Sequence, residues 1–547
     1  MIMIQNPILR GFNPDPSIVR VGDDYYIATS TFEWFPGVQM HHSRDLVNWR
    51  LLTRPLTRAS QLNMLGAPDS CGVWAPCLTY ADGLFWLIYT DVKRYGRTST
   101  GGATGSASLR DFHNYLVTSP SIEGPWSDPI YLNSSGFDPS LFHDDDGRKY
   151  LLNQLWDHRP GSNRFAGIVM QEFSVAEGRL VGKRENIFKG TPLGLTEAPH
   201  LYKRNGYYYL LTAEGGTGWN HGVTMARSRE LHGPYELHPD TTILTSRNRP
   251  DAALQRAGHA DLVETQDGQT YMVYLCGRPL RNRGTCTLGR ETALQPMVWG
   301  EDGWLRTRDG QGTPELQPAA PGLPEHRFAE APVRADFDEA QLPPAFQWLR
   351  TPWPEGLFSL TERPGHLRLF GRESVGSQFR QSLVARRQQS HCYSASTVVE
   401  FEPEHYQQQA GLICYYGAAK FHYLYITHDD EAGKHLRVMS SLPNHVQTDT
   451  FTAPIPLPSG VPVQLRVEVD EERLYFGYRL GDGEWHWLPQ MFDASILSDE
   501  ANAPGQPNFT GAFVGMACQD MSGAALHADF DYFEYREREY CMDARRS

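Results

Sequence analysis

Three carboxylates stand at related points of this chain and could together carry acid–base chemistry. Asp15 and Asp138 each precede a proline, and Glu197 lies directly before the Ala198–Pro199 pair, which occupies the same place in another segment. An Asp before Pro is a common turn opener, so either residue alone would more often be structural than catalytic. Carboxylates gathered in one place repel one another, however, and such a cluster is costly unless it has a function. One protonated and one ionised carboxyl group are what general acid and general base catalysis require.

The spacing of these residues follows an internal repeat. Five segments share a short apolar run, a turn and an aromatic-rich run, usually introduced by a proline. Their first positions are spaced by 60, 63, 60 and 61 residues and are occupied by Asp15, Ala75, Asp138, Ala198 and His259. Two β-runs joined by a Gly or Asp turn are typical of a hairpin, and each unit has room for four strands.

The repeat predicts an all-β chain that begins with a five-bladed β-propeller. We place this propeller at residues 1–320, a Pro-rich linker at 321–333 and an antiparallel, jelly-roll-like β-sandwich at 334–547. The alternative is a β-sandwich in place of the propeller, but sandwich strands do not repeat at a fixed long period. The first strand of each blade lines the central channel, so the repeat positions, with Trp74 and Glu197 beside them, should face one funnel.

Charge and composition limit the classes of molecule that the protein is expected to bind. The 547 residues include 50 Lys and Arg against 64 Asp and Glu, and a net charge of −14 argues against a nucleic-acid partner. No apolar run approaches the roughly 18 residues of a membrane-spanning helix, and the first residues do not resemble a signal peptide. Eight dispersed cysteines without a CxxC pair indicate reduced thiols. We therefore expect a cytoplasmic protein with no membrane partner.

Carboxylates in an aromatic-lined channel suit the hydrolysis of a glycosidic bond. One carboxylic acid protonates the leaving oxygen, while a second carboxylate activates water or attacks the sugar. Residues on opposite blades are far enough apart to admit a water molecule, which predicts inversion at the anomeric carbon. A propeller that binds one ligand per blade would repeat the same residues. This chain has diversified them, which favours one asymmetric central site.

Several short motifs resemble glycoside hydrolase family 43, and in particular its two-domain β-xylosidases. Each motif is weak alone, but the combination is specific and extends over nearly the whole chain. The motifs are NPDPS (13–17), GFDPS (136–140), TEAPH (196–200), GHADLVET (258–265), GRETALQP (289–296) and FTGAFVGMACQDMSG (509–523).

The resemblance implies a role for each carboxylate. It makes Asp15 the general base that activates water and Glu197 the general acid. Asp138 becomes the third carboxylate, which orients the acid and raises its pKa. These roles require no cofactor. For His259 the resemblance implies a place beneath the pocket, where the histidine of some relatives ligates a calcium ion; a single His is a weak signal for calcium, which prefers several oxygen ligands.

The resemblance also implies substrate contacts. Arg290 would contact sugar hydroxyls, whereas its neighbours alone would favour a surface ion pair with Glu291. Phe32 and Trp74 would form pocket walls, although each would otherwise be interpreted as a core residue.

A Phe and Gly alternation over residues 509–515 suggests why the second domain is present. Glycines in a strand let another backbone approach closely. The resemblance implies that Phe509 reaches the propeller near Asp15 and Trp74 and closes one side of the pocket. We expect Phe513 to be an ordinary packed strand residue.

Together with the carboxylates, the resemblance implies an exo-acting, inverting hydrolase that releases xylose from the non-reducing end of imported β-1,4-xylo-oligosaccharides. α-L-Arabinofuranosidase activity on arabinosides, alone or in addition, stays open because the two pentoses present similar hydroxyl patterns. A non-catalytic carbohydrate-binding propeller would tolerate loss of the carboxylates, yet this chain keeps all three. The β-sandwich as an independent sugar-binding module also stays open. Relatives suggest a homo-oligomer, which no feature of this sequence indicates.

Overall fold

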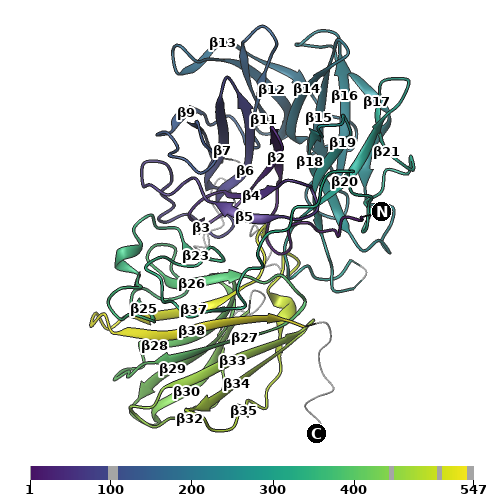
Figure 1. The fold of residues 1–547 in the computed structure, drawn as a ribbon. Coiled ribbons are helices and arrows are strands. Elements are labelled where there is room, and N and C mark those ends of the chain that lie inside the picture. The colour runs from purple at the N-terminus through teal and green to yellow at the C-terminus, as the bar shows by residue number, and fades with distance from the viewer. Residues whose placement is uncertain (1, 96–108, 282, 443–448, 502–507, 539–547) are drawn as a thin grey trace.

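The computed structural model contains two all-β domains, which lie one above the other in Figure 1. In the part of the chain that the structure describes, the only helices are the 3₁₀ turns η1 (Pro354–Gly356) and η2 (Ala494–Ile496). No helix there has the length and apolar character needed to cross a bilayer. The described residues are 2–95, 109–281, 283–442, 449–501 and 508–538.

The N-terminal domain is the five-bladed propeller that the repeat predicted. Each blade is a four-stranded antiparallel sheet, and its first strand belongs to the predicted repeat unit. Blade 1 contains β1 (Ser17–Val21), β2 (Asp24–Thr29), β4 (Gln39–Ser43) and β5 (Arg50–Thr53). Blade 2 contains β6 (Gly72–Ala81), β7 (Leu84–Arg94), β8 (Asp111–Ser119) and β9 (Ile130–Asn133). Blade 3 contains β10 (Ser140–His143), β11 (Lys149–Trp156), β12 (Phe165–Ser174) and β13 (Arg179–Phe188). Blade 4 contains β14 (Glu197–Arg204), β15 (Tyr207–Glu214), β16 (Gly222–Ser228) and β17 (Glu236–Thr245). Blade 5 contains β18 (Gln255–Glu264), β19 (Thr270–Gly277), β20 (Glu291–Trp299) and β21 (Leu305–Thr307).

Turn chemistry explains the tight hairpins that join the first two strands of several blades. Asp82 and Gly83 have φ values of 55° and 75°, and Asn205 and Gly206 have 49° and 73°. Two successive residues with positive φ form the turn whose twist matches that of the flanking strands. Glycine adopts this conformation freely, and Asp and Asn tolerate it better than most residues.

The N-terminal segment closes the ring of blades against blade 5. Leu9 forms a bridge with Thr292 of β20. The side chain of Asn6 donates to the carbonyl of Leu294 at 2.8 Å and accepts from its N–H at 2.9 Å. First and last blades are therefore joined by the chain that precedes the first blade.

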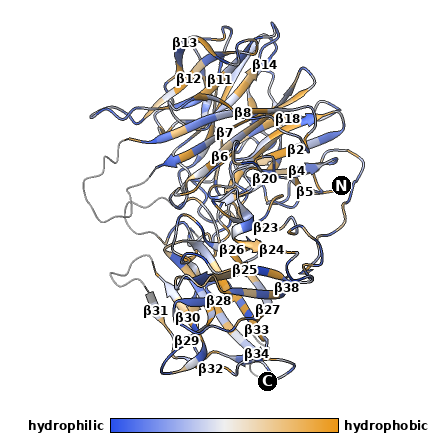
Figure 2. Cartoon of the chain, turned by 90° about the vertical axis from the view of Figure 1, so that its left-hand side faces the viewer, coloured by the Kyte–Doolittle hydropathy of each residue, from blue (hydrophilic) through white to orange (hydrophobic). Residues whose placement is uncertain are grey.

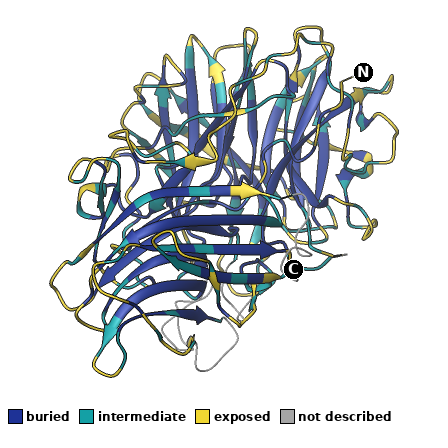
Figure 3. Cartoon of the chain, turned by 60° about the horizontal axis from the view of Figure 1, so that its bottom comes forward, coloured by how far each residue is buried: buried dark blue, intermediate teal, exposed yellow. Residues whose placement is uncertain are grey.

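The C-terminal domain is the predicted β-sandwich, built from two antiparallel sheets whose facing sides form its core. The strands of both domains are mostly buried, with exposed residues concentrated in loops (Figure 3), and many strands are rich in apolar residues (Figure 2). We call the sheet that contacts the propeller the inner sheet and the other the outer sheet. The inner sheet contains β23 (Phe346–Leu349), β26 (Ser382–Arg387), β37 (Phe513–Asp520), β28 (Gln408–Gly417), β29 (Lys420–Asp429), β30 (Gly433–Ser441), β31 (Asp449–Phe451) and β32 (Ile455–Pro456). The outer sheet contains β22 (Arg334–Ala335), β24 (Phe358–Ser359), β25 (Leu367–Phe370), β38 (His527–Glu537), β27 (Cys392–Glu400), β33 (Val463–Asp470), β34 (Arg473–Leu480), β35 (His486–Trp487) and β36 (Phe492–Asp493).

One strand of the propeller belongs to the inner sheet. β3 (Trp34–Phe35) pairs with β23, so that Leu349 lies opposite Trp34. Trp34 is fully buried, and its ring stacks on that of Phe513 with centroids 3.8 Å apart. The expectation that Phe513 is a packed strand residue agrees with the structure, since Phe513 is fully buried in β37; in addition, β3 carries a propeller ring onto it. The two domains share one continuous apolar core.

The segment that links the two domains packs against blade 1. The N–H of His326 donates to the carboxylate of Asp45 at 2.8 Å. The ring of Phe328 lies 5.4 Å from that of His42, and the guanidinium of Arg50 lies 4.7 Å from the same Phe ring. These contacts hold the linker on the propeller surface.

The seven cysteines within the described residues are all free thiols. Burial raises the pKa of Cys71, Cys77 and Cys286 to about 12, so these thiols stay protonated and unreactive at neutral pH. Cys541 and the predicted C-terminal bound at residue 547 lie outside the described residues.

Candidate active site

The five repeat positions share an uncommon backbone conformation. The angle φ is positive at each of them: 56° at Asp15, 38° at Ala75, 53° at Asp138, 52° at Ala198 and 46° at His259. Side chains other than Gly rarely adopt this left-handed region, and such strain concentrates at functional sites. In blades 2, 4 and 5 the pairing of the first two strands also shifts register at this point. These irregularities re-aim side chains that a regular strand would hold in plane.

A cavity of about 320 Å³ lies beside the repeat positions Asp15, Asp138 and His259. All eight residues predicted for the site line it, so the fold brings together side chains from the first blade to the last and from the sandwich. Its polar lining includes the carboxylates of Asp15, Asp138 and Glu197 together with His259 and Arg290. Its aromatic walls are Phe32, Trp74, Tyr95, Phe137, Phe165 and Phe509.

Asp15 is held through both carboxylate oxygens. The hydroxyl of Ser30 donates to Oδ2 at 2.6 Å, and Nη1 of Arg290 donates to Oδ1 at 3.1 Å. Nδ1 of His259 lies 3.6 Å from Oδ1. Burial lowers the pKa of His259 to about 4, so this imidazole is neutral at physiological pH. Asp15 is consequently the carboxylate of the cavity that a guanidinium contacts directly.

Arg290 lies inside the cavity and connects the two domains. It is 4% exposed, and its Nη2 donates to the carbonyl of Phe509 at 2.8 Å while Nη1 reaches Asp15. The alternative interpretation of Arg290, a surface ion pair with Glu291, is therefore wrong. Glu291 is fully buried and accepts two hydrogen bonds from Arg278, at 2.7 and 2.8 Å.

Glu197 and Asp138 bind their protons more tightly than ordinary carboxyl groups. Burial raises the pKa of Glu197 well above its usual range, and the negative charges of Asp138 and Asp15 raise it further. Burial and the charge of Asp15 likewise raise the pKa of Asp138, although the N–H of Ala198 donates to its Oδ2 at 3.1 Å. The nearby Arg290 offsets only part of both effects. The pair therefore holds a proton to higher pH than ordinary carboxyl groups do, which suits a general acid.

Phe509 extends from the sandwich into the aromatic wall. Its ring lies 5.4 Å from that of Trp74, at an interplanar angle of 83°, and 5.7 Å from that of Tyr95. The approach is possible because Gly289 has no side chain: a Cβ there would lie 2.3 Å from the carbonyl of Thr510. The expected position of Phe509 across the domain interface, beside Trp74, agrees with the structure.

Two family descriptions cover the chain. Residues 4–305 match glycosyl hydrolases family 43, and residues 334–536 match the β-xylosidase C-terminal concanavalin A-like domain. The chain belongs to glycosyl hydrolase family 43.

Known family 43 proteins resemble the chain along its full length. It is 52% identical to the xylosidase/arabinosidase 43B of Humicola insolens, with 99% of each chain covered. It is 50% identical to a β-xylosidase of Bacillus subtilis, over 98% of this chain and all of that one. A crystal structure of xylan β-1,4-xylosidase from Bacillus halodurans C-125 superposes with a TM-score of 0.93 at 54% identity, covering 98% of this chain and 100% of that chain.

The side chains around His259 do not by themselves form a calcium site in this family 43 hydrolase. Within the described residues, no group of three or more His, Cys, Asp or Glu side chains is arranged to hold a metal ion. One imidazole beside the carboxylate of Asp15 supplies fewer oxygen ligands than calcium prefers. A calcium ion at His259 stays a prediction.

Sequence reasoning missed several residues of the cavity. Phe137 could have been found, because it stands directly before a repeat position, as Trp74 and Glu197 do. Tyr95 lines the cavity but only follows strand β7 and carries no repeat signal. Ser30 likewise follows strand β2 without such a signal, and it supports the site by donating a hydrogen bond to Asp15.

Proposed function

We propose that this family 43 hydrolase is an exo-acting, inverting β-xylosidase that releases xylose from the non-reducing end of β-1,4-xylo-oligosaccharides. The observation that carries the proposal is a small aromatic cavity with three carboxylates, of which two have raised pKa values and one contacts a guanidinium. The relatives named as xylosidases support the substrate class.

Glu197 acts as the general acid in this proposal. Its raised pKa keeps a proton available to higher pH than an ordinary Glu would. As the glycosidic bond breaks, that proton passes to the leaving oxygen, so the shortened oligosaccharide departs as a neutral alcohol. Asp138 supports the transfer because its charge raises the proton affinity of Glu197.

Asp15 acts as the general base. Hydrogen bonds from Ser30 and Arg290 fix both of its oxygens. Asp15 takes a proton from water while the water oxygen bonds to the anomeric carbon on the face opposite the leaving group. The product is α-xylose, and proton exchange with solvent restores both carboxyl groups.

The aromatic walls support exo action. The rings of Trp74 and Phe509 meet at the sandwich side of the cavity, which favours the end of a chain over an internal segment. The same walls exclude water from the carboxylates, which strengthens the electrostatic effects on the reacting groups.

The test is a paired assay on an aryl β-xyloside and an aryl α-arabinofuranoside, with the first-formed sugar followed by NMR. We expect faster hydrolysis of the xyloside and initial release of α-xylose. Release of β-xylose would contradict inversion, and a preference for the arabinofuranoside would contradict the substrate assignment.

A further inference from the structure

Ser70 lies where blades 1 and 2 meet the sandwich, and it is not among the residues that line the cavity. It is 1% exposed and has a left-handed backbone, with φ of 61°. Its N–H donates to Oε2 of Glu33 at 3.1 Å. Its carbonyl accepts from the indole of Trp74 at 3.0 Å, and its hydroxyl accepts from the N–H of Phe509 at 3.1 Å. One residue thus contacts two walls of the cavity that come from different domains.

Residues of the sandwich hydrogen-bond to the propeller loop that contains Ser70. Arg350 is fully buried, and its guanidinium donates to the carbonyl of Ala67 at 2.7 Å and to Oδ1 of Asp69 at 2.6 Å. The N–H of Ala418 donates to the other oxygen of Asp69 at 2.7 Å. Since Asp69 directly precedes Ser70, docking of the sandwich fixes where the Ser70 hydroxyl lies.

The main chain of Phe509 is held on both sides by the propeller. Ser70 accepts from its N–H, and Arg290 donates to its carbonyl at 2.8 Å. Arg290 also contacts Asp15, the proposed base. The main chain of Phe509 therefore cannot shift away from Trp74 without breaking hydrogen bonds to the propeller.

We propose that Ser70 is a positioning residue that sets the Phe509 ring against Trp74 and thereby shapes the cavity for its sugar. It acts through these two rings and makes no contact with substrate itself. The choice of xylobiose as the probe below rests on the proposed β-xylosidase function, whereas the positioning of Phe509 does not.

The test is Ser70→Ala, which removes the hydroxyl and keeps the Cβ and the backbone. Ser43→Ala is the matched control: Ser43 is fully buried, its hydroxyl accepts from the N–H of Leu46 at 2.9 Å, and it does not line the cavity. Ser70→Ala should raise KM for xylobiose about 2- to 10-fold, the range that one hydrogen bond supports. Its kcat should stay within about 2-fold of wild type. Ser43→Ala should change thermal stability alone.

A second measurement separates positioning from general loosening. In a Phe509→Ala background there is no ring to position, so Ser70→Ala should add little to KM. Amide hydrogen exchange at Phe509 should be faster in Ser70→Ala than in wild type or Ser43→Ala, and this readout is independent of the substrate. Unchanged exchange at Phe509, an unchanged KM, or fully additive effects of the two substitutions would overturn the proposal. A wild-type enzyme inactive on xylobiose would instead overturn the proposed function, and the exchange rates would still decide the role of Ser70.

Discussion

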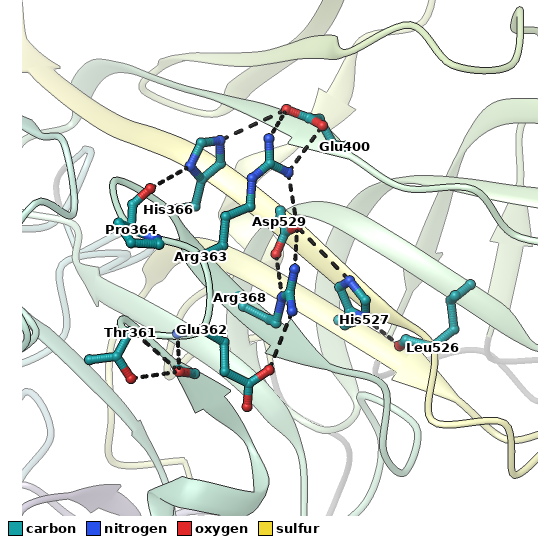
Figure 4. A network of polar contacts seen from close by, with 12 residues as sticks. Thr361, Glu362, Arg363, Pro364, His366, Arg368, Glu400, Leu526, His527 and Asp529 are labelled. Atoms are coloured by element: carbon teal, nitrogen blue, oxygen red, sulfur yellow. Dashed lines mark hydrogen bonds and ion pairs between the residues drawn. The ribbon is translucent and has the colours of Figure 1, made fainter.

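Asp529 in the outer sheet and Asp138 in the cavity are buried to nearly the same extent, 5% and 7% exposed. Burial raises the proton affinity of both, but their neighbours differ. Asp529 accepts hydrogen bonds from Arg368 at 2.8 and 2.9 Å and from Arg363 at 2.9 Å, and these two guanidiniums outweigh burial and lower its pKa (Figure 4). Around Asp138 the charge of Asp15 adds to the effect of burial, and its pKa rises.

Direct contact with guanidinium groups separates the structural buried acid Asp529 from the two acids of the cavity whose pKa is raised. In the outer sheet, Arg363 also donates to both oxygens of Glu400, so the 359–368 turn is fixed to β38 and β27 (Figure 4). The cavity places one guanidinium, that of Arg290, among three carboxylates. That guanidinium hydrogen-bonds to Asp15, and its charge offsets only part of the rise in the pKa of Asp138 and Glu197, so these two acids hold their protons more tightly and can deliver one to a substrate.

The largest expected effect on activity comes from removing the carboxyl group of Glu197, the proposed general acid. Glu197→Gln should reduce kcat/KM on xylobiose about 10²- to 10⁴-fold, because the leaving oxygen loses its acid. An aryl xyloside with a good leaving group should lose far less, since it departs with little protonation. Asp529→Asn serves as the control and should leave both rates unchanged. Equal losses on the two substrates would count against Glu197 as the acid.

A smaller effect, on stability and not on activity, is expected from replacing Asp529, which is paired with two arginines. Asp529→Asn leaves Arg363 and Arg368 without their shared carboxylate and should lower the free energy of unfolding by about 1–3 kcal/mol. Urea unfolding measures the change. Asp531→Asn is the matched control, two residues along the same strand but more exposed, and should change stability little. A normal unfolding midpoint for Asp529→Asn would show that the network is dispensable.

The two sites should also respond to pH in opposite directions. The pKa of Glu197 is raised in the folded state, so its contribution to stability is present below its usual pKa and is lost as pH rises through the raised value. Glu197→Gln should therefore be more stable than wild type at neutral pH, because the amide that replaces the buried acid does not ionise.

The pKa of Asp529 is lowered, so its contribution is present above its usual pKa and is lost as pH falls through the lowered value. The stability difference between Asp529→Asn and wild type should consequently vanish in acid. Urea titrations of wild type and both variants across pH test the two signs. A Glu197→Gln variant that is less stable than wild type at neutral pH would contradict the expected difference between Glu197 and Asp529.

The sequence was sufficient for features that repeat and insufficient for features that arise once. The spacing of Asp15 and Asp138 predicted the blades and aligned the carboxylates, because every blade solves the same packing problem. The two residues of β3 are too few to show a strand period, and they form a strand only because β23 lies beside them. No local pattern could reveal that Arg290 contacts Asp15 and not its neighbour Glu291, because Arg290 and Asp15 are 275 residues apart in the sequence.

The most direct test of this account is the protonation state of Glu197 in the resting enzyme at neutral pH. An infrared difference spectrum of wild type minus Glu197→Gln reports it, because a protonated carboxyl group and a carboxylate absorb separately. We expect a positive band from a protonated carboxylic acid, which disappears as the pH is raised through the pKa of Glu197. A difference spectrum with carboxylate bands alone at neutral pH would contradict the assignment of Glu197 as the proton donor.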